Sequence, residues 1–236
     1  MSRFRSLFAS TAVLAIAGVS LFAVTPLRAD EKDVERLRDA ATVFSEIMEA
    51  PDKGIPQDLL DKAYCIVVVP GLKKGAFIVG AKFGKGFVSC RSRKAGRNWS
   101  APGAVRVEGG SVGFQIGGSE TDVILLVMNK RGADRLLSSQ FTLGGEGEVA
   151  AGPVGRNATA QTDAKFTAEL LSWSRTRGIF AGVSLQGATL RQDDDANRDL
   201  YGKKISNRQI VDSSIAAPAA ASPLMSQLNR YSQHEK

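Results

Sequence analysis

The chain of 236 residues is 43% hydrophobic and carries a formal net charge of +7, which fits one globular domain with an ordinary core. One histidine, His234, and two cysteines are too few for a usual zinc site. They also argue against a serine hydrolase: Ser111 lies in a G-x-S-x-G pattern, but the only histidine is near the C-terminus. No pair of acid and base or nucleophile is visible, so composition favours a binding or structural protein over an enzyme.

The first 29 residues have the layout of a secretory signal peptide. A short basic head precedes an apolar run from Leu7 to Val24, and the small Ala29 suits the position before a cleavage site. The alternative is an uncleaved membrane anchor, because an apolar run of about 20 residues can span a bilayer. Cleavage would remove three of the 31 basic residues, which leaves 28 against 24 acidic residues. The leader predicts a periplasmic or secreted protein.

Two helices are predicted after the leader. Apolar residues recur at steps of three and four over residues 30–50, with charged residues on the opposite face, and Pro51 ends the pattern. A second, short helix is predicted over residues 55–62, with Pro56 near its first turn.

Strands dominate the next part of the chain. Short β-branched and aromatic runs bounded by glycine predict strands at 63–69, 75–82, 87–91, 99–107, 111–117 and 121–128. Gly84-Lys85-Gly86 fits a hairpin turn, because glycine reaches positive φ without a steric penalty. Glycines inside several strands predict a sheet that bends strongly. The expected fold is therefore α+β, a single domain with a strongly curved or barrel-like antiparallel β-sheet and flanking helices.

The second half of the chain continues in the same style. The predicted elements are a helix at 129–137, a weak strand at 147–158, a hairpin formed by 167–174 and 178–190, and helices at 193–201 and 207–212. From residue 213 the composition shifts to alanine, proline and serine and then to polar residues. Such a composition predicts a disordered tail. The expected organisation is a signal peptide at 1–29, one domain at 30–212 and a tail at 213–236.

The two cysteines, Cys65 and Cys90, both lie in predicted strands. In an exported chain they can form a disulfide that pins the first strand to the third. Two buried free thiols would fit strand interiors equally well. The sequence leaves both readings open.

Basic residues gather on the predicted sheet. Within 25 residues there are eight positive charges and no acidic residue: Lys73, Lys74, Lys82, Lys85, Arg91, Arg93, Lys94 and Arg97. Strand alternation and the predicted turn would bring Lys82 and Lys85 together. Such a cluster attracts anionic lipid headgroups or nucleic acid, with about 1 kcal/mol per charge near a charged membrane. The alternative is a solvated rim that only keeps the sheet soluble.

An ordered set of motifs resembles the SYLF domain family. The matching segments are residues 70–86, Trp99-Ser-Ala-Pro102, residues 109–118 and residues 121–128, supported by 152–156, 178–190 and Tyr201-Gly202. The resemblance covers about residues 32–212. It implies a lipid-binding domain. Eukaryotic members of the family bind phosphoinositide membranes and, in yeast relatives, actin filaments, whereas bacterial members are mostly exported.

The family's membrane binding is attributed to an amphipathic N-terminal helix together with basic residues. In this chain the helix predicted at 30–50 contains Glu31, Asp33, Glu35, Asp39, Glu46 and Glu49, which departs from the lysine-rich face of a membrane-surface helix. Packing of this helix onto the sheet is the plainer expectation. Export would also separate the chain from actin.

The sequence therefore predicts an exported module that binds anionic phospholipid or a membrane surface, without metal or cofactor. The residues expected to bind lipid are Lys73, Lys74, Lys82, Lys85, Arg91, Arg93 and Lys94, with Phe83 or Phe87 adding apolar contacts. The alternative is a structural or interaction protein of the cell envelope that binds another protein. A nucleic acid partner is not expected.

Overall fold

The computed structural model of the chain describes residues 30–51, 54–76, 79–91, 98–112, 117–145, 149–152, 169–176, 179–180, 185–213 and 215–232. The predicted signal peptide at 1–29 lies outside these residues.

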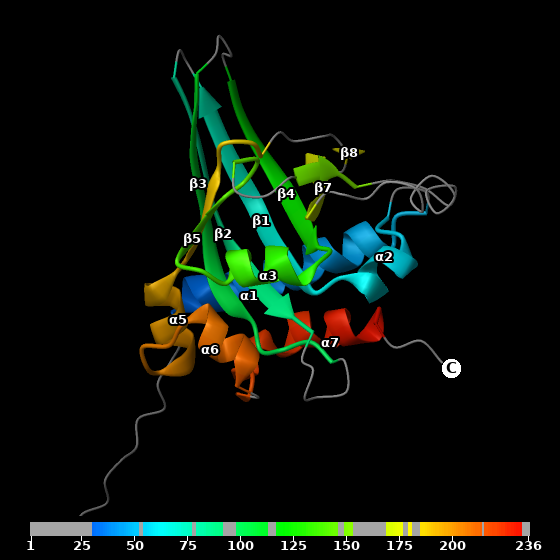
Figure 1. Cartoon of the computed structure of the whole chain (residues 1–236), viewed down its shortest axis with the longest axis vertical. Coiled ribbons are helices and arrows are strands. Elements are labelled where there is room, and N and C mark those ends of the chain that lie inside the picture. Colours follow the sequence, from blue (N-terminus) through cyan, green and yellow to red (C-terminus); the bar gives the residue numbers. More distant parts are fainter. Residues whose placement is uncertain are drawn as a thin grey trace, which may run out of the picture.

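A curled β-sheet forms the centre of the fold (Figure 1). Its four long strands are β1 (Cys65–Ala76), β2 (Val79–Cys90), β3 (Gly103–Val112) and β4 (Gly117–Val127). They pair antiparallel in the order β3-β2-β1-β4. Shorter strands extend both sides: β9 (Thr189–Gln192) and β5 (Gln140–Thr142) next to β3, and β7 (Leu170–Thr176), β6 (Val149–Ala151) and β8 (Ile179–Phe180) next to β4. Of these pairings only β6 with β7 is parallel. The predicted α+β fold with a strongly curved sheet is confirmed.

Helices cover the sheet on both faces. Helices α1 (Glu31–Met48), α2 (Gln57–Lys62) and α7 (Ser222–Arg230) share one core with the sheet, and α3 (Lys130–Leu136) packs on the other face. A short 3-10 helix, η1 (Ala219–Ala221), leads into α7. Helices α5 (Asp194–Tyr201) and α6 (Asn207–Asp212) follow β9 and contact β3.

The sheet has a hydrophobic core on each face, because side chains alternate along a strand. Ile66, Val68 and Trp173 pack with Phe44 of α1 on the helical face, and Val67, Val69 and Leu125 point to the other face, here called the inner face. The run at 123–128 is buried on both faces as predicted, since Val123 and Ile124 belong to different cores.

The hairpin turn predicted at Gly84-Lys85-Gly86 is wrong, because β2 runs through these residues as one strand. The glycines serve a close approach instead. A Cβ atom built on Gly86 would lie 2.1 Å from the carbonyl oxygen of Val68 on β1. The three strands predicted at 63–69, 75–82 and 87–91 therefore form two long strands, β1 and β2. The three strands predicted at 99–107, 111–117 and 121–128 likewise form two, β3 and β4, which run through the breaks predicted at 108–110 and 118–120.

The C-terminal segment, predicted to be disordered, instead contributes to the core in residues 215–232. Ala221, Leu224 and Leu228 of this segment are buried, and α7 packs against α1. Nε1 of Trp99 donates a hydrogen bond to the Leu228 carbonyl at 3.1 Å. The apolar steps of three and four within 221–228 are the signal that the composition of the segment had hidden.

Cys65 and Cys90 form a disulfide between directly paired positions of β1 and β2. Both residues are buried on the inner face, with exposed fractions of 1% and 4%. The bridge joins neighbouring strands, because the strands predicted separately at 75–82 and 87–91 are one.

Candidate binding groove

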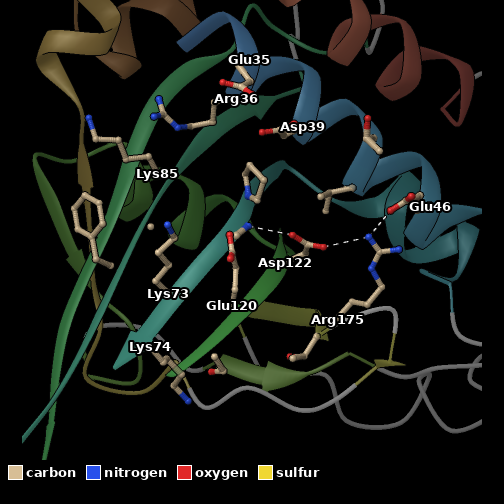
Figure 2. A pocket seen from close by; sticks show the side chains of 18 of the residues that line it. Glu35, Arg36, Asp39, Glu46, Lys73, Lys74, Lys85, Glu120, Asp122 and Arg175 are labelled. Atoms are coloured by element: carbon tan, nitrogen blue, oxygen red, sulfur yellow. Dashed lines mark hydrogen bonds and ion pairs between the residues drawn. The ribbon is translucent and has the colours of Figure 1, made fainter. Parts of the chain in front are cut away.

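An open groove with a volume of about 1470 Å³ lies between α1 and the part of the sheet that α1 leaves uncovered (Figure 2). One wall is the polar edge of α1, where Glu35, Asp39 and Glu46 recur at helical spacing. The floor comes from β1, β2 and β4, and the end of β7 closes one side. The wall is polar because the apolar face of α1 is already buried against the sheet.

A β-bulge decides which side chains reach the floor of the groove. The pairing of β1 with β4 shifts register between Val69 and Leu72, and Gly71 has a φ of 59°. An extra residue in one strand sends all later side chains to the opposite face. Leu72 is thereby buried in the inner core, and Lys73 turns to the groove.

An ion-pair network ties the bulge to α1. Asp122 accepts a hydrogen bond from the Gly71 amide at 3.0 Å and another from Arg175 at 3.1 Å. Arg175 also pairs with Glu46 on α1 (Figure 2). Burial by itself would lower the pKa of Arg175, but hydrogen bonds to the two carboxylates outweigh it and the pKa is raised. The network holds the C-terminal half of α1 over β4 and β7.

A second charged cluster lies beside the N-terminal half of α1. Nζ of Lys85 lies 2.7 Å from Oδ2 of Asp193, a buried residue that caps the N-terminus of α5. On α1, the buried Asp33 pairs with Arg36. Burial raises the pKa of Asp33, against the opposing effects of Arg36 and Lys85.

The Asp33→Asn variant is expected to change how stability depends on pH. A raised pKa in the folded state means that the fold favours the protonated acid, so this contribution is complete below the ordinary pKa of 3.8 and is lost as the pH rises through the raised value. The free energy of unfolding of the variant, relative to that of the original chain, should therefore increase between acidic and neutral pH. Urea unfolding at several pH values measures this difference.

A difference that stays constant with pH would contradict the role of Asp33. Arg36, Lys85 and Asp193 face the carboxyl group, and the carboxylates of Asp30 and Asp199 lie close to it. Because all of them remain in the variant, their titration is common to both proteins and largely cancels in the comparison.

The predicted lipid-binding residues do not form one surface. Lys73 is exposed in the groove, whereas Lys74 is half-buried and pairs across the strands with Lys82, which is buried. Burial, with a smaller effect of Lys74, lowers the pKa of Lys82. Lys85 lines the groove and binds Asp193. It does not lie beside Lys82 as the predicted turn implied, because β2 continues through both residues and strand residues three apart point to opposite faces.

The other predicted residues lie elsewhere. Arg91 stacks on Trp99, with 4.4 Å from its guanidinium carbon to the ring centre, and donates a hydrogen bond to the Leu60 carbonyl at 2.9 Å. Arg93 and Lys94 fall outside the described residues. Phe87 is buried in the core with an exposed fraction of 2%, whereas Phe83 is 49% exposed and lines the groove. Of the two predicted apolar contacts, only Phe83 is available.

The acidic residues of the groove were missed by sequence reasoning. Glu35, Asp39 and Glu120 line the same groove as Lys32, Lys73 and Lys74, so the groove carries both signs of charge. The basic cluster looked free of acid because the acidic residues come from α1 and β4, which are distant in sequence. Pro70-Gly71 was the local signal that could have indicated a bulge.

Among the described residues, no helix combines the length and the apolar content needed to cross a bilayer.

Comparison with known proteins places the chain in a family. The profile described as "Ysc84: Las17-binding protein actin regulator" matches residues 108–231, more than half of the chain. The chain is 39% identical to the SH3 domain-containing protein PJ696.02 of Schizosaccharomyces pombe, over 74% of this chain and 41% of that protein. It is 32% identical to the human SH3 domain-containing YSC84-like protein 1, over 83% of this chain and 58% of that protein.

Protein YSC84 of Saccharomyces cerevisiae is 33% identical, over 74% of this chain and 37% of the yeast protein. The chain thus spans about half the length of these relatives, or less. The names describe regulatory or binding proteins.

Proposed function

Because this chain belongs to the Ysc84 family, the family of the SYLF domain, we propose that it is a binding module without enzymatic activity that docks on anionic lipid. The docking residues would be Lys73 and Phe83, at the end of the groove away from α1, and the adjacent Lys74 would add charge from the other face of β1. Export to the periplasm or to the outside of the cell, as the sequence of residues 1–29 suggests, is part of this proposal.

The observation that carries the proposal is the exposed Phe83 beside Lys73. The two residues are direct cross-strand partners, so an aromatic ring and an ammonium group project together from the sheet. This pairing suits a membrane interface, where the charge meets the headgroups and the ring reaches the apolar boundary. Lys85 and Arg91 are left out of the docking set because Asp193 and Trp99 already engage them.

Charge reversal at Lys73 and Lys74 is expected to weaken binding to anionic vesicles. At about 1 kcal/mol per charge, the loss of two lysines should lower the affinity by at least about tenfold. The measurement is co-sedimentation of the chain from Asp30 with neutral and anionic vesicles, at low and high salt. Binding should be confined to anionic vesicles and should fall with salt.

The matched control reverses Lys203 and Lys204, two exposed lysines between α5 and α6. It changes the net charge equally and should bind vesicles like the original chain. Equal weakening by both double variants would contradict a defined docking site, and no binding at all would reject the lipid proposal.

A second candidate is the binding of another protein. It is favoured by the two signs of charge in the groove, since a surface for anionic lipid alone needs no acidic residues. The family description names the protein Las17 and actin regulation, which adds support for protein partners. Under this candidate the vesicle experiment gives no binding, and crosslinking at groove positions such as Asp39 recovers a partner from the cell envelope.

A further inference from the structure

The part of the sheet beyond α1 presents two neighbouring rows of residues, one large and one small, each crossing β3, β2, β1 and β4. The large row is Glu108, Phe83, Lys73 and Glu120. The small row, two residues further along each strand, is Gly110, Ala81, Gly75 and Gly118. Residues directly paired or two apart share a face, so both rows lie on the face of the sheet that α1 packs against.

No described side chain covers the small row. All four of its residues are exposed. A Cβ atom on Gly75 would meet nothing within 4 Å, and those on Gly110 and Gly118 would meet only backbone carbonyl oxygens at 3.9 and 3.8 Å. Next to this bare strip of backbone, the ring of Phe83 is half exposed. An exposed apolar ring beside a flat strip suits a partner that covers both.

We propose that this face binds a second copy of the chain, face to face, about a two-fold axis that crosses the strands between the two rows. This rotation places the large row of each copy over the small row of the other. The rows are about 6.8 Å apart along the strands, so the side chains of Phe83 and its neighbours fill the space that the glycines leave open. The contact is reciprocal, as a closed two-fold dimer requires.

The charges of the large row suit a contact with its own copy. A face with one sign of charge would repel itself, whereas this row combines Lys73 with Glu120 and Glu108. Glu108 is already paired with Arg106 and Arg191. In the antiparallel arrangement, Lys73 of one copy comes diagonally next to Glu120 of the other.

The height of α1 fits the same arrangement. A helix rises about 10 Å above the sheet that it covers, and one layer of sheet is about equally thick. The uncovered part of a second sheet, packed on the uncovered part of the first, would therefore lie beside α1 at the same height above the first sheet. In the antiparallel arrangement the two α1 helices lie at opposite ends and do not collide.

The size of the face predicts a weak dimer. Four strands about 4.8 Å apart, covered over about 20 Å of their length, give roughly 400 Å² per copy. This is about half of the roughly 800 Å² per partner that stable complexes bury. We expect a dissociation constant of tens of micromolar.

The test is sedimentation equilibrium of the chain from Asp30, without vesicles, from about 1 to about 200 µM, a range that brackets the expected constant. The original chain should show a monomer–dimer equilibrium. Ala81→Arg fills the small row and Phe83→Ser removes the ring, so each should raise the dissociation constant at least tenfold. Ser139→Arg, at an exposed position between α3 and β5, adds the same charge as Ala81→Arg away from this face and should leave the dimer unchanged.

Two results would overturn the proposal. One is a monomer at every concentration, and the other is a dimer that Ala81→Arg and Phe83→Ser leave intact. Circular dichroism checks the fold of each variant, and Gly75→Arg replaces Ala81→Arg if that variant does not fold. A second copy and a membrane would cover the same residues, Lys73 and Phe83, so dimer formation and lipid docking compete for this face. Because no lipid is present in the sedimentation test, a failure of the dimer leaves the vesicle experiment to decide the lipid proposal.

Discussion

Replacing both Cys65 and Cys90 by alanine is expected to lower the free energy of unfolding by about 3 kcal/mol. The disulfide closes a loop between residues 25 apart in sequence, and this cross-link restricts the unfolded chain more than the folded one. The two β1 and β2 positions are already paired in the sheet, so the folded state needs no rearrangement when the bridge is lost. Urea unfolding followed by tryptophan fluorescence measures the effect, since Trp99 and Trp173 are both buried.

Reductant provides the control for the disulfide prediction. It should destabilise the original chain by a similar amount and leave the double alanine variant unchanged. An original chain with the same urea midpoint in oxidising and reducing buffer would show that the bridge contributes nothing to stability.

The Gly86→Ala variant is expected to lose about 3 kcal/mol or more, or to fail to fold. The added Cβ would lie 2.1 Å from the Val68 carbonyl oxygen and 2.8 Å from the Val69 Cα. Both atoms belong to the backbone of β1, which is held by β2 on one side and β4 on the other. Because a paired central strand cannot move aside as a flexible side chain can, the clash has no inexpensive relief.

Gly75→Ala is the matched control for this variant. Gly75 lies on β1 in the same sheet, and its added Cβ would meet nothing within 4 Å. Its unfolding free energy should stay within about 0.5 kcal/mol of the original. Similar losses at both glycines would contradict the close approach of β1 and β2 as the cause of the Gly86 effect, since alanine is itself the better residue in a strand.

Local pattern was sufficient for much of the fold. The spacing of apolar residues in 30–50 predicted α1, and the continuous apolar run at 123–128 predicted a strand buried on both faces. Asn129 and Asp193 cap the helices α3 and α5 that were expected near them. These features depend on neighbours in the chain, so they can be read without the tertiary structure.

Glycine was where local reading failed. The glycines at 84 and 86 favoured a turn, but glycine also permits another backbone to approach closely. Only the position of β1 shows which of these two roles the glycines have. The prediction of a disordered C-terminal segment was wrong for a related reason. Its few apolar residues become a buried face only when α1 and Trp99 are present to cover them.

By itself, the sequence determined the fold class, most helices, the family resemblance and the small set of lysines and phenylalanines from which a site could be drawn. The tertiary structure decided which of these residues are available. The bulge at Pro70-Gly71 turns Lys73 to the groove and Leu72 to the core, Asp193 engages Lys85, and α1 and β4 bring acidic residues to a cluster that looked purely basic. The physical reason is that burial and charge pairing join residues far apart in the chain, and no local pattern records which partner each will meet.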